Sequence, residues 1–130
     1  LILEDDTVFK ENMEDIFNKA ISQIDKSDWD MLYLAGRHEN PTILTEDNLM
    51  RITGTLGAFA YAINKPLIKV LCDSLFKNGC ELDTFYKEAI HTRFRCYSIY
   101  PHIVESDPNT SNIYNTFIDY SMKIDNIPVI

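Results

Sequence analysis

The chain has 130 residues, a hydrophobic fraction of 45% and a net charge of −8 at pH 7. This length and composition fit one globular domain with its own core, over residues 1–130, and exclude a disordered chain. The negative charge argues against direct binding to nucleic acid or to an anionic membrane. No apolar run approaches the roughly 20 residues that a membrane-spanning helix needs.

The first part of the chain predicts a strand, a helix and a second strand. The apolar run Leu1-Ile2-Leu3 predicts a short buried strand. Apolar residues recur at helical spacing over 9–25, which predicts a helix there. The continuous apolar run 31–35, closed by Gly36, predicts a strand covered on both faces. Together these elements form a β-α-β unit, so the predicted fold class is α/β.

The rest of the chain predicts a mixture of strands and helices. The polar stretch 37–48 predicts a long loop, and 57–63 predicts a strand. A proline in the first turn favours a helix that starts at about Asn64, with an apolar face made of Leu67, Ile68, Leu71 and Leu75. The further expectations are a short helical segment over 83–89, a strand over 93–100, a loop over 105–112 and a terminal helix over 113–124.

Residue 1 is a leucine that already lies inside the first predicted strand. A strand needs a neighbour to pair with. We therefore expect the chain to be part of a longer protein that extends on the N-terminal side.

Three adjacent acids, Glu4-Asp5-Asp6, stand between the first strand and the first helix. In open α/β sheets, the carboxyl ends of the strands form the crevice where ligands bind. Carboxylates there suit a hard divalent cation, and alternation along the chain lets Glu4 and Asp6 face the same side. A turn whose charges are simply solvated is the alternative interpretation of the same pattern.

Four blocks of the chain stand in the order found in a known enzyme family: LILEDD (1–6), WDMLYLAG (29–36), GTLGAFAYAINK (54–65) and LDTFY (82–86). Over residues 1–90 the chain resembles glycosyltransferase family 25, the lipopolysaccharide-type and procollagen galactosyltransferase-like enzymes. The resemblance implies a GT-A fold, which is a Rossmann-like mixed sheet flanked by helices. Residues 1–130 would be its C-terminal part, beginning at the strand before the acidic DxD motif and lacking the N-terminal nucleotide-binding strands.

The resemblance implies an enzyme that moves a hexose from a nucleotide sugar to a hydroxyl of a glycan, a lipopolysaccharide or a protein, with inversion. The resemblance suggests UDP-galactose as the donor. The DxD motif maps to Glu4-Asp5-Asp6, with Glu4 and Asp6 as metal ligands and Glu4 and Asp5 beside the donor. A cation, Mn²⁺ or Mg²⁺, is needed because a diphosphate and a chain of charge −8 repel each other.

Four further residues are expected to take site roles, each with a structural alternative. Asp83 in LDTFY is the expected catalytic base, although an aspartate there also suits the N-cap of a helix. His102 is an expected third metal ligand, or a packed histidine. Gly54 and Thr55 are expected to contact the donor, or to form a simple turn into the next strand.

Two other function classes stay open. One is a catalytically inactive GT-A-like domain that binds a glycan or a protein. The other is a Mg²⁺-dependent receiver-type phosphotransfer domain, which is disfavoured because no later strand ends in a lone Asp. We expect a cytoplasmic location, free or associated with a membrane, with an endoplasmic reticulum, Golgi or virion-factory setting as the alternative.

Overall fold

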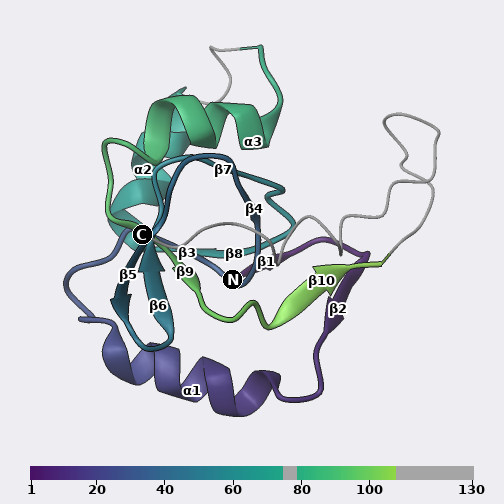
Figure 1. The fold of residues 1–130 in the computed structure, drawn as a ribbon. Helices are drawn as coiled ribbons and strands as arrows, with labels where there is room; N and C mark the ends of the chain where they lie inside the picture. The colour runs from purple at the N-terminus through teal and green to yellow at the C-terminus, as the bar shows by residue number, and fades with distance from the viewer. Residues whose placement is uncertain (75–78, 108–130) are drawn as a thin grey trace.

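The computed structural model describes residues 1–74 and 79–107, so the predicted helix over 113–124 lies outside the described residues. The described part is a mixed α/β fold built on a sheet flanked by helices (Figure 1). Along the sheet the strand order is β1 (Ile2–Leu3), β8 (Ala60–Ile63), β3 (Met31–Tyr33), β9 (Cys96–Ile99), β6 (Leu49–Arg51) and β5 (Ile43–Glu46). The predicted α/β class is therefore confirmed.

Strand β3 lies in the middle of the sheet and organises both halves of the core. It pairs in parallel with β9 and antiparallel with β8, and β8 also pairs antiparallel with β1. Successive β3 side chains point to opposite faces, as pleating requires. Met31 and Tyr33 belong to one buried cluster, whereas Leu32 and Leu34 belong to the other. The prediction of a strand covered on both faces is confirmed.

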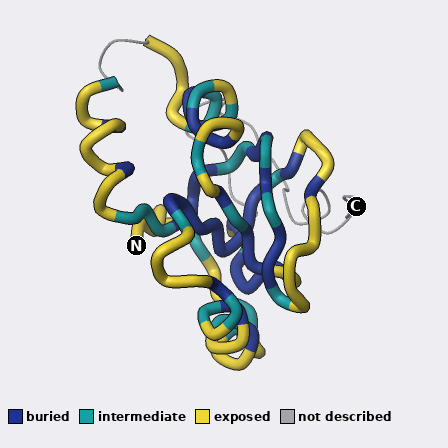
Figure 2. The backbone as a smooth tube through the Cα atoms, turned by 90° about the vertical axis from the view of Figure 1, so that its left-hand side faces the viewer, coloured by how far each residue is buried: buried dark blue, intermediate teal, exposed yellow. Residues whose placement is uncertain are grey.

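Helices cover both faces of the sheet. Helix α1 (Met13–Gln23) packs Ile16 and Ala20 into the cluster that contains Leu32. On the other face lie α2 (Lys65–Ser74), α3 (Leu82–Phe85) and the π-helical turn η2 (Tyr86–Ile90). Figure 2 shows the buried backbone running through the central strands, with exposed residues on the outer sides of the helices.

Two short ribbons complete the fold. Strand β2 (Thr7–Phe9) pairs antiparallel with β10 (Val104–Ser106), which joins the two ends of the described chain. Strand β4 (Arg37–His38) pairs antiparallel with β7 (Thr55–Leu56), and α3 and η2 pack against β7. These ribbons carry most of the polar groups described below.

Three predicted elements differ from those in the structure, and two of them differ because of strand pairing. The first helix begins at Met13 and not at Phe9, because Phe9 pairs with Val104 in the β2–β10 ribbon. The predicted loop over 37–48 contains β4 and β5, since both strands find antiparallel partners further along the chain. The strand over 93–100 is limited to Cys96–Ile99.

The first strand is not buried as predicted. Strand β1 pairs with β8 and lies at the edge of the sheet, where Leu1 is 74% exposed and Ile2 and Leu3 are each 43% exposed. A strand at the edge of a sheet has a neighbouring strand on one side only. The apolar character of residues 1–3 was therefore not sufficient to predict that they are buried. The helix predicted from Asn64 is confirmed as α2, in which Leu67 and Leu71 are buried. Ile68 is 45% exposed, so its place on the buried face is wrong, and Leu75 lies outside the described residues.

Candidate functional site

The acidic segment that follows β1 is held against the start of β8. The Glu4 amide donates to the Phe59 carbonyl at 2.7 Å, and the Thr7 hydroxyl donates to the same carbonyl at 3.1 Å. The Thr7 amide then donates back to the Glu4 carbonyl at 3.2 Å. The backbone of the acidic turn is therefore fixed at both ends, although Glu4 and Asp5 are exposed.

The carboxylate of Asp6 has one satisfied oxygen and one without a partner. Ser106 donates its hydroxyl to Asp6 Oδ2 at 2.6 Å, and the Asp107 amide donates to the Asp6 carbonyl at 2.8 Å. In the described part of the chain, Asp6 Oδ1 is buried and accepts no hydrogen bond. Buried carboxylate oxygens are normally paired, so this oxygen is suited to a donor or a cation that the protein itself does not supply.

The carboxyl group of Glu4 lies near the negative charges of three other acids. Partial burial is the largest cause that raises the pKa of its carboxyl group, followed by the charges of Asp6, Asp5 and Asp83. The structure therefore brings the acidic turn and Asp83 into one electrostatic neighbourhood, although they are about 80 residues apart in the chain.

Asp83 is oriented by two backbone amides. Its Oδ1 accepts from the Thr84 amide at 2.7 Å, and its Oδ2 accepts from the Gly57 amide at 3.3 Å. Gly57 has a φ of 81°, a conformation that an L-residue rarely adopts. The N-cap prediction is wrong in position, because the helix begins at Leu82 and its cap residue is Glu81. Asp83 lies within the first turn, and its carboxylate is held toward β7.

Aromatic side chains line the interior next to this cluster. The hydroxyls of Tyr61 and Tyr86 lie 3.2 Å apart, and the rings of Tyr33 and Tyr61 stack with centroids 5.7 Å apart. Burial is the main cause that raises the pKa of Tyr61, and the charge of Glu4 raises it further. Burial raises the pKa of all three phenols, which therefore stay neutral at pH 7.

His102 takes part in a separate buried pair. Its Nε2 lies 3.0 Å from Nε2 of His38, whose Nδ1 lies 2.7 Å from the Thr55 hydroxyl. Burial lowers the pKa of His38 to about 4 and that of His102 to about 3, so both imidazoles are neutral at pH 7. Within residues 1–74 and 79–107, no group of three or more His, Cys, Asp or Glu side chains is arranged to hold a metal ion. The structure thus places His102 with His38 and not with Glu4 and Asp6.

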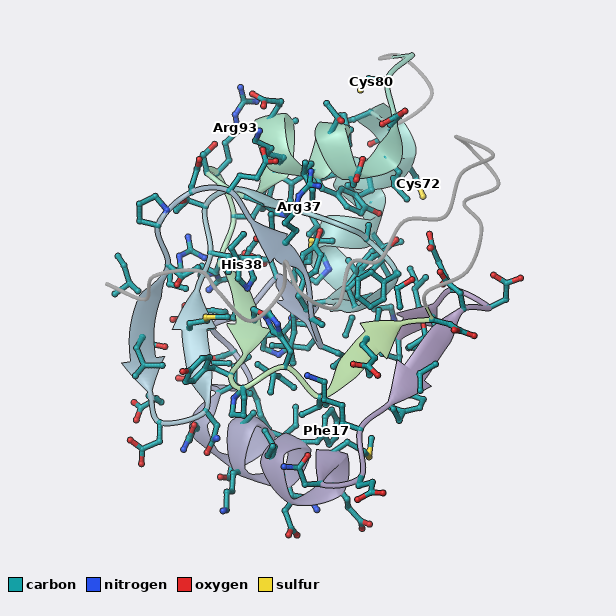
Figure 3. The ribbon with its side chains drawn as sticks, turned by 45° about the vertical axis from the view of Figure 1, so that its right-hand side comes forward. Phe17, Arg37, His38, Cys72, Cys80 and Arg93 are labelled. Atoms are coloured by element: carbon teal, nitrogen blue, oxygen red, sulfur yellow. The ribbon has the colours of Figure 1, made fainter. Side chains whose placement is uncertain are left out.

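Gly54 and Thr55 lie in the same buried network as this histidine pair. Thr55 is fully buried, and its amide donates to Nδ1 of His91 at 3.2 Å. The Gly54 carbonyl accepts from the amides of Glu39 and Asn40 at 2.8 and 3.2 Å. The polar groups of these two residues therefore serve the β4–β7 ribbon, whose residues His38 and Arg37 are labelled in Figure 3.

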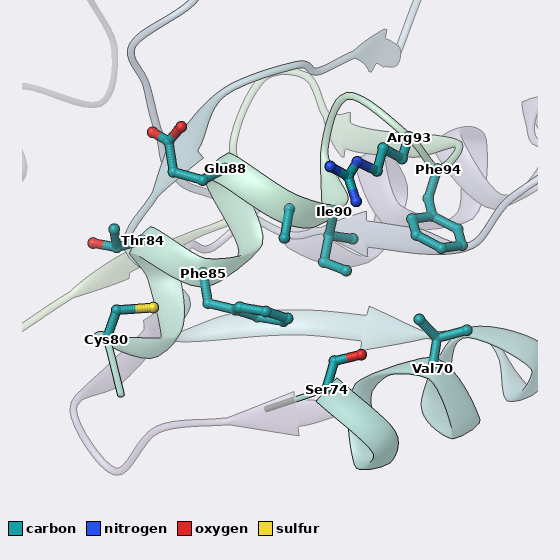
Figure 4. A pocket seen from close by; sticks show the side chains of 10 residues that line it. Val70, Ser74, Cys80, Thr84, Phe85, Glu88, Ile90, Arg93 and Phe94 are labelled. Carbon is teal, nitrogen blue, oxygen red and sulfur yellow. The ribbon is translucent and has the colours of Figure 1, made fainter. Parts of the chain in front are cut away.

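A pocket of about 530 Å³ lies between α2 and the α3–η2 segment (Figure 4). This volume is within the range of small-molecule sites. Its wall combines apolar and polar side chains, among them Val70, Phe85, Ile90, Phe94, Glu88 and Arg93. Thr84 also reaches this wall, but Asp83 and the acidic turn do not. The pocket is therefore distinct from the acidic cluster, although α3 contributes to both.

Two site residues could not be identified from the sequence. Ser106 contacts Asp6 across 100 positions of sequence, and no motif surrounds it. Gly57 was part of a predicted strand, and its amide contact with Asp83 depends on how α3 packs on β7. Both contacts are made by tertiary structure, so local patterns carry no information about them.

No protein-family model, curated protein or solved structure matches this chain. In the part of the chain that the structure describes, no helix is long and apolar enough to cross a membrane. The site must therefore be interpreted from its own residues.

Proposed function

We propose that this domain is a metal-dependent glycosyltransferase of the GT-A type, similar to family 25. It would transfer a hexose from a nucleotide sugar to an acceptor hydroxyl. The observation that supports this most is the convergence of Glu4, Asp6 and Asp83, with Asp6 Oδ1 buried and unpaired. The mixed sheet, with the acidic turn at the carboxyl end of β1, supports the same fold type.

The donor atoms of the acidic turn fit a hard divalent cation. Mg²⁺ is usually held by one or two carboxylates together with substrate phosphates and water, and not by a cage of protein ligands. Glu4 and Asp6 can supply two carboxylates, and no donor in the described residues uses Asp6 Oδ1. When bound, the ion would neutralise the diphosphate and act as a Lewis acid toward the leaving nucleotide.

The protein's own part in the transfer falls to Asp83. Each of its carboxylate oxygens accepts one backbone N–H and keeps a second lone pair for a substrate hydroxyl. The carboxylate can therefore accept the proton of the acceptor hydroxyl as that oxygen attacks the sugar, while Gly57 and Thr84 fix its direction.

Binding of UDP, measured by calorimetry with and without Mn²⁺, tests this proposal. Asp6→Asn and Glu4→Gln should each weaken Mn²⁺-dependent binding by at least about tenfold, as expected for loss of a charged ligand. Asp47→Asn is the matched control, because Asp47 is an exposed acid in the turn between β5 and β6. Binding that ignores Mn²⁺, or that survives Asp6→Asn unchanged, would falsify the metal assignment.

A second arm separates binding from chemistry. Asp83→Asn should keep Mn²⁺-dependent UDP binding and lose sugar transfer, because the amide cannot accept the proton. Full transfer by Asp83→Asn would remove Asp83 as the base. UDP binding by the unaltered protein without transfer to any acceptor would instead favour the inactive glycan- or protein-binding module.

A further inference from the structure

Two cationic side chains share one carboxylate next to Asp83. Lys87 Nζ lies 2.7 Å from Oε2 of Glu39, and Arg37 Nη2 lies 3.1 Å from the other oxygen, Oε1. The side chains of Arg37 and Lys87 are 34% and 26% exposed, so both are reachable yet partly shielded from solvent. We call Arg37, Glu39 and Lys87 the cation cluster.

The cation cluster is tied to Asp83 from two sides. Lys87 follows Asp83 by four residues in the continuous α3–η2 segment, so it lies on the same side about one turn further along. Arg37 pairs with Leu56 in the β4–β7 ribbon, and the next residue, Gly57, donates its amide to Asp83. The cation cluster and Asp83 are therefore neighbours through the α3–η2 segment and through the β4–β7 ribbon.

The cation cluster has unused capacity for an anion. Two positive charges face the single carboxylate of Glu39, and the nearest other acid, Glu88, lies 3.8 Å from Lys87 with a side chain that is 69% exposed. In the described residues, the Arg37 side chain donates only through Nη2, so Nη1 is not engaged, whereas Nε is buried and does not face an incoming anion. A guanidinium presents paired N–H groups that match the two oxygens of a carboxylate or phosphate.

We propose that Arg37 and Lys87 bind an anionic group, a carboxylate or a phosphate, carried by the acceptor sugar. This inference rests on the proposed function, because Asp83 marks the place of the reacting hydroxyl. The anionic group binds beside Glu39 and holds the acceptor with its hydroxyl toward Asp83. A chain of charge −8 otherwise repels acidic sugars, so these two cations determine which acceptors can approach.

Binding of three related sugars, measured by NMR titration without donor or metal, tests the inference. Glucose 6-phosphate and glucuronate should bind at least about tenfold more tightly than glucose, the effect of one charge-assisted contact. Arg37→Gln and Lys87→Gln should each remove most of that preference. Lys69→Gln is the matched control, because in the described residues Lys69 pairs with Asp73 on the exposed side of α2. This substitution should leave the preference unchanged. Equal binding of all three sugars would overturn the inference, as would full preference in both cluster variants.

A further measurement separates this inference from the proposed function and from a role with the donor. Asp6→Asn should abolish Mn²⁺-dependent UDP binding and leave the preference for acidic sugars intact. If the unaltered protein binds acidic sugars but no UDP, the anion site stands and the transferase assignment falls. If Arg37→Gln weakens UDP binding and leaves acidic-sugar binding unchanged, the cation cluster holds the donor diphosphate and the acceptor assignment is wrong.

Discussion

Removing the hydroxyl of Ser106 should weaken both the fold and the proposed metal site. In Ser106→Ala, Asp6 Oδ2 loses its 2.6 Å hydrogen bond, while Oδ1 already lacks a partner in the described chain. Hydrogen bonds to charged groups contribute about 1.5–3 kcal/mol to stability. Asp6 as a whole is only partly buried, so water can replace some of the contact, and we expect a loss near the lower end, about 1.5 kcal/mol.

The same substitution should affect metal binding through orientation. Ser106 fixes the rotation of the Asp6 carboxylate, and such outer contacts typically change metal affinity by about 10- to 100-fold. Urea unfolding at pH 7 without metal measures the first effect, and calorimetry of UDP with Mn²⁺ measures the second. Ser106→Thr keeps a hydroxyl and should restore most of both.

Ser98→Ala is the control for this experiment. Ser98 is fully buried, but within the described residues its hydroxyl makes only a 3.5 Å contact with the Ile99 carbonyl and none with a carboxylate. It should therefore lose less stability than Ser106→Ala and bind UDP with Mn²⁺ normally. Equal losses in the two variants, or normal metal-dependent binding by Ser106→Ala, would refute the reasoning.

Two further predictions concern pH. Stability should fall as pH is lowered from 7 to 5, because burial lowers the pKa of His38 to about 4 and of His102 to about 3, while the unfolded chain takes up these protons near pH 6.5. Urea midpoints should therefore decline over this range, and less steeply in His102→Gln. Asp30→Asn should cost about 1–2 kcal/mol at pH 7, because Asp30 is 7% exposed and accepts hydrogen bonds from Arg95. The Arg95 hydrogen bond lowers the pKa of Asp30 below its usual 3.8, so this difference from wild type should shrink only as pH falls below that value. A difference that persisted unchanged into strong acid would contradict the assignment.

The elements with continuous or periodic apolar patterns were predicted well from the sequence. The run 31–35 lies in the centre of the sheet, and Leu67 and Leu71 form the buried face of α2. The strands that were predicted wrongly are those whose formation or burial depends on pairing with distant strands. Strands β4 and β5 lie in polar sequence, and they exist because β7 and β6 supply hydrogen-bond partners. Position at the edge of the sheet, and not composition, explains the exposure of β1.

For the candidate site, the sequence identified the acidic residues but not the side chains that form hydrogen bonds with the site residues. The local pattern placed Glu4 and Asp6 after a strand, and the resemblance singled out Asp83, which the structure brings into their electrostatic neighbourhood. The hydroxyl of Ser106 was not foreseen, nor was the pairing of His102 with His38. Each such contact joins residues more than 60 positions apart, so it depends on the completed fold.

The β2–β10 ribbon also bears on the order in which the molecule assembles. Ser106 pairs with Thr7 and bonds Asp6, so the loop that must close spans nearly the whole described chain. Closing so long a loop is entropically costly, and contacts of this kind tend to form after local ones. The ribbon lies outside the six-stranded sheet, although Val104 of β10 is buried in the same core cluster as Leu32. A folding chain can therefore pair the central strands while the Asp6 carboxylate is still unrestrained, and the proposed metal site should be among the last parts of the domain to form together with the final packing of Val104.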